Sequence, residues 1–237
     1  MSPLPSEHIL GSFDEALNSL RNDVLTMASL TERNLTQTFE SLFQRDTELA
    51  NQVIADDEEI DTLEKQVDAD GIDILLRFQP VARDLRAIIA TMKVGANLER
   101  IADQATSIAR RVRKLNLEEA LPETTELEPM AAEAVMMLKD SLRAFTDGDV
   151  DLALTIKPRD KQLDALNAQL SVRYTELMSR NPEQIRGYLE LIFIARSLER
   201  VGDHATNIAE DAVYAKNAHD IRHLQNEQRA VGAARSD

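Results

Sequence analysis

Two stretches of this chain decide its fold: residues 98–109 are LERIADQATSIA and residues 198–209 are LERVGDHATNIA. Both follow the pattern LERxxDxATxIA. A match of this length within one chain predicts an internal duplication, in which each copy is one structural unit. Apolar residues recur every three or four positions in both copies, which is typical of an amphipathic helix.

The repeat continues upstream of these two stretches. Aspartates four residues apart recur in both halves, and so does an aspartate that stands three residues before a Leu-Ala dipeptide. The matched residues are Asp57/Asp61 with Asp160/Asp164, Asp46 with Asp149, and Arg86 with Arg186. Arg86 precedes Glu99 by the same distance at which Arg186 precedes Glu199. The duplication therefore covers most of each half.

Six segments carry the periodic apolar pattern and predict six helices. We expect helices over 17–42, 49–78 and 82–112 in the first half, and over 128–145, 151–178 and 182–216 in the second. Consecutive helices are separated by Pro80, by the turn at Gly148 and by Pro182. The polar segment 116–126, which contains Pro122, is expected to be a linker.

The predicted fold is all-α, with two tandem, pseudo-symmetric three-helix bundles over residues 12–116 and 124–216 and a frayed polar tail over 217–237. The composition agrees with this prediction. Hydrophobic residues make up 43% of the chain and aromatic residues only 4%, and Trp and Cys are absent. Such a composition favours helix-on-helix packing over a β-sandwich or barrel, and it excludes disulfides and thiolate metal sites.

Charge and hydropathy limit the partners and the compartment. The chain has 42 acidic and 27 basic residues and a net charge of -15, which repels nucleic acid and anionic membranes. No apolar run approaches the ~20 residues that span a bilayer, and the start has no basic region followed by an apolar one. We expect a cytoplasmic protein that associates with membranes only through its partners.

Paired carboxylates are the candidate functional groups. Residues four apart share one helix face, so each Asp or Glu pair projects in one direction. If a pair from the second helix of a half lies beside a pair from the third, four carboxylates repel one another unless a proton or cation intervenes. Oxygen ligands favour Mg²⁺, Mn²⁺, Ca²⁺ or oxidised iron over copper. The candidate metal ligands are Asp57, Asp61, Glu99, Asp103, Asp160, Asp164, Glu199 and Asp203.

A solvated helix face is the competing interpretation of these acids. In a chain this acidic, chance gives about seven acid pairs at a spacing of four, and charge runs are usually solvated surface. Their duplication at equivalent positions favours a site, but both interpretations stay open on these residues alone.

The other polar residues do not form a known catalytic motif. Arg100 and Arg200 are expected to form surface salt bridges. His204 corresponds to Gln104 in the first half and is expected to be a surface or packing residue. No histidine has a glutamate three residues before it, as di-iron bundles require, and the GxxxxGK[ST], GxSxG and HExxH motifs are absent.

The residues that carry these patterns resemble the PhoU family. The segment 199–210, ERVGDHATNIAE, is similar to that family's characteristic sequence, and residues 99–109 are similar to its partner copy. Residues 13–27, residues 57–64 and Pro80 followed by Asp84-Leu85-Arg86 are similar as well. The resemblance covers about residues 13–214.

The resemblance implies a regulator and not an enzyme. Members of this family restrain phosphate uptake and phosphate-starvation signalling by linking a phosphate ABC transporter, through its ATPase, to a sensor histidine kinase, and they often form homodimers. Their E(D)xxxD motifs bind metal ions, which implies Mg, Mn, Fe or Zn at the eight acids above. Ala102 differs from Gly202, and Gln104 from His204, so the two sites need not bind equally.

Two alternatives stay open, and the first of them uses the same acids. The first is a carboxylate-bridged metalloenzyme or metal-storage bundle. The second is a structural or phosphotransfer bundle, which would be indifferent to metal or be phosphorylated at His204.

Overall fold

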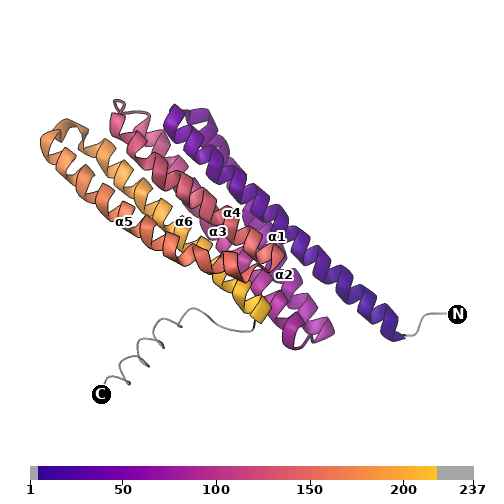
Figure 1. Ribbon diagram of the computed structural model, residues 1–237. Coiled ribbons are helices and arrows are strands. Elements are labelled where there is room, and N and C mark those ends of the chain that lie inside the picture. Colours follow the sequence, from indigo (N-terminus) through magenta and orange to yellow (C-terminus); the bar gives the residue numbers. More distant parts are fainter. Residues whose placement is uncertain (1–4, 218–237) are drawn as a thin grey trace, which may run out of the picture.

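The structure is a computed structural model that describes residues 5–217. These residues form six long helices (Figure 1), and no strand occurs among them. The elements are α1 (Pro5–Gln44), α2 (Thr47–Phe78), α3 (Ala82–Leu115), the 3₁₀ helix η1 (Pro122–Leu127), α4 (Glu128–Asp147), α5 (Val150–Arg180), the 3₁₀ helix η2 (Pro182–Gln184) and α6 (Ile185–Asn217). The predicted all-α fold is confirmed.

Short capping motifs set the helix ends. The Asp46 carboxylate accepts a hydrogen bond from the Leu49 N–H, and Asp149 accepts one from the Leu152 N–H, each at 3.0 Å. These aspartates are the N-caps of α2 and α5, which explains their recurrence in both halves. Gly148 ends α4 in a left-handed conformation, with φ 65°, which a glycine adopts without steric cost.

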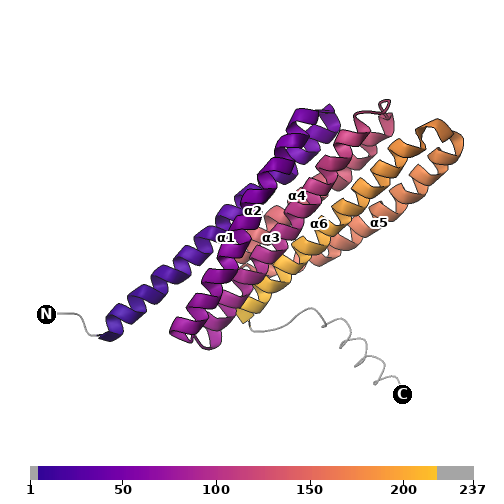
Figure 2. The same ribbon diagram turned by 180° about the vertical axis from the view of Figure 1, so that it is seen from behind.

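The six helices lie side by side in one elongated bundle, as the opposite views in Figures 1 and 2 show. Helices α1–α3 form one half and α4–α6 the other, and α3 packs against α6 between them. Arg111 near the end of α3 forms a salt bridge with Glu190 near the start of α6. Lys93, earlier in α3, forms one with Asp211 near the end of α6. The two central helices are therefore antiparallel.

The halves share a continuous hydrophobic core. Fully buried residues from both halves belong to one cluster, among them Leu35, Ile101, Leu138 and Leu198. Since burial of apolar area is the main favourable term in folding, the shared core joins the two predicted bundles along α3 and α6.

Three details differ from the sequence expectation. Helix α1 begins at Pro5, earlier than residue 17. The segment between α3 and α4 contains η1, and its Leu121 and Leu127 are buried. Arg45 also donates hydrogen bonds to three backbone carbonyls at the end of α3, those of Leu115, Asn116 and Glu118. The linker is thus anchored, because apolar side chains and a bridging guanidinium hold it.

The predicted frayed tail lies outside the described residues, apart from Asn217, the last residue of α6. Within residues 5–217, no helix is both long and apolar enough to cross a bilayer.

Candidate functional site

The structure brings the first four predicted ligands together. Asp57 and Asp61 lie on α2, and Glu99 and Asp103 on α3; we call this set acidic cluster one. Burial raises the pKa of Asp57, and the neighbouring charges of Asp61 and Asp103 raise it further. Burial also raises the pKa of Glu99, as do Asp103 and Asp61. These mutual effects show that the two acid pairs face one another across α2 and α3.

The second four ligands gather in the same way. Asp160 and Asp164 on α5 and Glu199 and Asp203 on α6 form acidic cluster two. Burial raises the pKa of Asp160 to about 6, with added repulsion from Asp203, Asp164 and Glu199. The pKa values of Glu199 and Asp203 are raised by burial and by neighbouring carboxylates as well. In both halves the pair on one helix therefore lies within electrostatic reach of the pair on the next, and metal binding by these pairs stays a prediction.

The two clusters differ in depth. A Cβ atom on Gly202 would lie 3.1 Å from Asp160 Oδ1, so the carboxylate approaches the α6 backbone where glycine leaves space. At the equivalent position in the first half, Ala102 is buried and fills that space. Asp160 Oδ1 is also buried and has no hydrogen-bond partner within residues 5–217. Cluster two therefore holds an unsatisfied acceptor, which a cation or a proton could satisfy.

Flanking charges distinguish the clusters further. Arg100 pairs with Glu99 at 3.2 Å and with Asp103 at 3.3 Å, which confirms the salt bridge expected for Arg100. The same expectation was wrong for Arg200, which has no ion-pair partner within residues 5–217, although its charge lowers the pKa of Asp203. Exposed guanidinium groups gain little from pairing, and sequence does not decide which of them pair.

Three further charged residues belong to these sites and were missed from the sequence. Glu64 raises the pKa of Glu99 in cluster one, where Arg110 lowers the pKa of Asp57. In cluster two, Lys157 lowers the pKa of Asp160 and bonds to Glu210 at 2.9 Å. Glu210 is the repeat counterpart of Arg110. Comparing the halves at this position would have revealed that the second half lacks the cation that Arg110 supplies in the first.

The clusters have the right chemistry for a hard cation but an open geometry. Carboxylate oxygens are the preferred ligands of Mg²⁺, Ca²⁺ and Mn²⁺. Within residues 5–217, however, no three acidic or histidine side chains lie close enough together to hold one ion. Metal binding at these clusters would therefore require the carboxylates to move toward one another, and it remains a prediction.

His204 occupies a packing position between the halves. Its Nδ1 lies 3.0 Å from Asn97 Oδ1, across the contact between α6 and α3. Burial lowers the pKa of His204, and the positive charges of Arg100 and Arg200 lower it further. The residue is thus a half-buried hydrogen-bonding group at the contact between the halves, in agreement with the surface or packing role expected from its sequence position.

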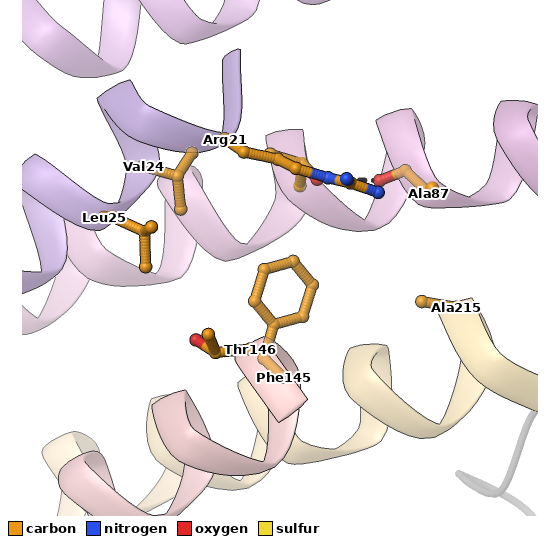
Figure 3. A pocket seen from close by; sticks show the side chains of 8 residues that line it. Arg21, Val24, Leu25, Ala87, Phe145, Thr146 and Ala215 are labelled. Carbon is orange, nitrogen blue, oxygen red and sulfur yellow. Dashed lines mark hydrogen bonds between the residues drawn. The ribbon is translucent and has the colours of Figure 1, made fainter. Parts of the chain in front are cut away.

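A pocket of about 250 Å³ lies apart from both clusters (Figure 3). It opens between α1 and α3 on one side and α4 and α6 on the other, and the Phe145 ring projects into it. Arg21 is the only charged residue among its lining residues, which are Arg21, Val24, Leu25, Ala87, Thr91, Phe145, Thr146 and Ala215. None of the eight predicted ligands lines this pocket.

Comparison with known proteins agrees with this duplicated architecture. A family model described as the PhoU domain matches residues 24–112 and again residues 127–212. The chain belongs to the PhoU family. The resemblance inferred from the repeated LERxxDxATxIA pattern is thereby confirmed.

Relatives in the PhoU family match nearly the whole chain. A Pseudomonas putida protein named phosphate-specific transport system accessory protein PhoU homolog is 37% identical over 220 residues, covering 92% of this chain and 86% of that protein. The PhoU protein of Escherichia coli K12, also named a phosphate-specific transport system accessory protein, is 32% identical and covers 92% and 91%. The crystal structure of PhoU from Pseudomonas aeruginosa superposes with a TM-score of 0.85 at 35% identity, covering 87% of this chain and all of that one.

Proposed function

We propose that this protein is a non-enzymatic accessory regulator of phosphate transport. It links a phosphate ABC transporter, through the transporter ATPase, to a sensor histidine kinase and restrains the phosphate-starvation response when phosphate is plentiful. The observation that carries the proposal is the match of both repeats to the PhoU domain, together with relatives named as transport accessory proteins over nearly their full length.

The two acidic clusters are the proposed metal sites. Burial and, after it, repulsion between neighbouring carboxylates raise the pKa values of Asp57, Glu99, Asp160, Glu199 and Asp203. A bound cation would offset both effects. Each cluster is formed by two helices, so a cation shared by them would tie α2 to α3 and α5 to α6. The proposed ions are Mg²⁺, Mn²⁺, iron or Zn²⁺, and their role is to stabilise the scaffold on which partners dock.

The proposed setting is the cytoplasm, with the protein as a homodimer. The net charge of -15 opposes direct binding to anionic lipid, so association with the membrane occurs through the transporter and the kinase.

A binding assay tests this proposal. The full chain is immobilised and exposed to the transporter ATPase and to the cytoplasmic part of the sensor kinase, with and without phosphate. We expect both to be retained, with phosphate strengthening the complex. Retention of neither protein under either condition would contradict the proposal.

A turnover assay tests the alternative that this protein is a metalloenzyme. The metal-loaded chain is incubated with phosphoesters, peroxide or ferrous iron. We expect no turnover above that of the free metal, and turnover that disappears in the Asp160→Asn variant would favour the enzyme instead.

A further inference from the structure

The pocket near Arg21 lies between the two halves of the molecule (Figure 3). Helices α1 and α3 of the first half and helices α4 and α6 of the second half all line it. A molecule bound in this cavity, which we call the Arg21 pocket, would therefore contact both repeats. The lining residues are Arg21, Val24 and Leu25 on α1, Ala87 and Thr91 on α3, Phe145 and Thr146 on α4, and Ala215 on α6.

The walls of the Arg21 pocket are mainly apolar. Val24 and Thr91 are buried, each 2% exposed, whereas Leu25 and Thr146 are exposed at its edge. The Phe145 ring projects into the space between the helices. Pockets for small molecules are typically concave and apolar, carry a few polar groups, and often lie between structural units. The Arg21 pocket has each of these features.

Both hydroxyl groups of the pocket donate hydrogen bonds within their own helices. Thr91 Oγ1 donates to the backbone carbonyl of Ala87 at 2.8 Å, and Thr146 Oγ1 donates to that of Leu142 at 2.9 Å. A cavity holds water well only where two to four polar partners surround each molecule. The Arg21 pocket therefore suits an apolar body better than a cluster of water molecules.

Arg21 is the charged group that faces this cavity. Its side chain extends across the pocket toward Ala87 (Figure 3). Within residues 5–217, its guanidinium forms neither an ion pair nor a hydrogen bond. A guanidinium presents its N–H groups as a planar fork, which matches the two oxygens of a carboxylate. The pocket thus combines apolar walls with one donor for an anionic head group.

The other charges around the pocket cancel. Lys93 pairs with Asp211 at 3.0 Å, and the Asp149 carboxylate caps α5. The charge of a ligand therefore depends on Arg21, which lines the cavity itself. Among the described residues within four positions of a lining residue, the acids are Asp23, Asp84, Asp147, Asp149 and Asp211, and the further cations are Arg83, Arg86, Lys93, Arg143 and Lys216.

The volume of the pocket limits the size of the ligand. A cavity of about 150 Å³ binds benzene, so a cavity of about 250 Å³ has room for about ten non-hydrogen atoms. One arginine balances one negative charge. A phosphate monoester carries about −1.5 to −2 at neutral pH, which Arg21 alone does not balance. A monocarboxylate with an apolar chain or ring fits both the size and the charge.

We propose that the Arg21 pocket binds a small amphipathic monocarboxylate of about ten non-hydrogen atoms. Its apolar body lies against Val24, Leu25 and Phe145, and its carboxylate pairs with the Arg21 guanidinium. Because the pocket is lined by both repeats, the bound molecule ties α1 and α3 to α4 and α6. This site is separate from the acidic clusters and does not depend on the proposed function.

Calorimetric titration of the full chain with octanoate tests the proposal. We expect one molecule to bind per chain, and acetate, which lacks the apolar body, not to bind. Each methylene from pentanoate to octanoate should tighten binding about fourfold, since burial of one contributes about 0.8 kcal/mol. This gain should stop in longer chains, which exceed the pocket. Octanol and octylamine are the neutral and cationic probes with the same chain.

Two variants locate the bound molecule. Ala215→Leu fills the pocket and should abolish binding. Arg21→Gln should weaken octanoate about tenfold and leave octanol unchanged, so that the preference for the carboxylate disappears. The matched controls are Ala165→Leu and Arg83→Gln, which change exposed residues outside the lining and should bind octanoate as the wild type does. Melting temperature and helicity verify that every variant is folded.

Several results would overturn the Arg21 pocket as a carboxylate site. They are no saturable binding of octanoate to the wild type, equal binding to the wild type and Ala215→Leu, and a preference for octanoate over octanol that survives Arg21→Gln. Tighter binding of octylamine, or displacement of octanoate by inorganic phosphate, would also contradict it. None of these measurements uses the transporter ATPase or the sensor kinase, so this proposal and the proposed function fail or succeed separately.

Discussion

Asp160 Oδ1 lies 3.1 Å from the point where a Cβ atom on Gly202 would sit. The carboxylate can take this position because residue 202 has no side chain. In the first half, Ala102 occupies the equivalent position and is buried. One missing methyl group therefore accompanies the deeper placement of Asp160, whose pKa is raised to about 6.

The Gly202→Ala variant is expected to be less stable and to move Asp160 outward. The new methyl group would lie 2.6 Å from Leu163 Cδ2, and Leu163 is fully buried. Overpacking costs about 1–3 kcal/mol, which exceeds the gain of at most about 1 kcal/mol from replacing a helical glycine. Urea denaturation measures the net loss, and carboxyl NMR shifts should show a lower pKa for Asp160.

Ala102→Gly is the matched control for that variant. It removes a buried methyl group from a helix. It should cost about 1 kcal/mol through helix propensity and about 1 kcal/mol more through lost burial, with no change at Asp160. A Gly202→Ala protein as stable as the wild type, with Asp160 still titrating near 6, would show that the glycine does not determine the depth of cluster two.

The stability of the protein should decrease as pH rises through the titration of Asp160. Its folded pKa of about 6 lies above the model value of 3.8, so between these values the folded chain holds a proton that the unfolded chain has lost. Stability gained from this proton is fully present below pH ~4 and is lost as the pH passes ~6. Asp160→Asn should remove this contribution, because the amide stays neutral and keeps a similar shape.

Melting temperatures at pH ~5.2 and ~7.2 test this expectation. The melting temperature of the Asp160→Asn variant should exceed that of the wild type by more at the higher pH. There the wild-type carboxylate is charged beside Asp164, Glu199 and Asp203. Comparison with the variant isolates Asp160 from the other acids, whose pKa values are also raised. An equal difference at both pH values would mean that Asp160 titrates normally.

The sequence predicted the fold well because its periodic signal was strong and was present twice. The apolar stripe through Leu98, Ile101 and Ala105 and its copy through Leu198, Val201 and Ala205 are buried as expected. The turn at Gly148 was expected from the sequence, whereas Asp46 and Asp149 were noted only as repeated residues and proved to be N-caps. The anchored linker was missed because burial of Leu121 depends on packing from distant helices, which no local pattern reveals.

The candidate ligands could be named from the sequence, but their geometry could not. Helical spacing placed each carboxylate pair on one face, and duplication selected the pairs that are proposed as ligands. The contributions of Glu64, Arg110 and Lys157 depend on how neighbouring helices face one another. Whether the carboxylates close on an ion depends on side-chain positions of a few tenths of an ångström, which spacing along a sequence does not fix.

Two buried polar residues in α1 should be replaceable with a gain in stability. Thr31 and Asn34 are 0% and 1% exposed, and Thr31 Oγ1 and Asn34 Oδ1 have no hydrogen-bond partner within residues 5–217. The same repeat positions in α4 hold Ala134 and Met137, which are buried and apolar. We expect Thr31→Val and Asn34→Leu each to raise the free energy of unfolding by about 1 kcal/mol, because an unsatisfied buried acceptor is removed.

Thr38→Val provides the contrast in the same helix. The Thr38 hydroxyl is buried but donates a 2.7 Å hydrogen bond to the backbone carbonyl of Asn34. Its removal should therefore cost about 0.5–1.5 kcal/mol. Urea denaturation of the three variants gives the comparison. Loss of stability in Thr31→Val equal to that in Thr38→Val would indicate that the Thr31 hydroxyl has a partner such as a buried water molecule.

The central claim is that the duplicated carboxylates bind cations, and a melting experiment with Mn²⁺ tests it most directly. The full chain is compared with a variant in which Glu99, Asp103, Glu199 and Asp203 are changed to Ala, and with a control in which exposed Glu15, Glu58, Glu59 and Glu176 are changed to Ala. At about one hundred times the dissociation constant, a ligand of the native state adds about 2.7 kcal/mol, which corresponds to about 5–10 °C in a chain of this size. We predict that shift for the wild type and the control and none for the cluster variant. An equal shift in all three proteins, or none in the wild type, would contradict the claim.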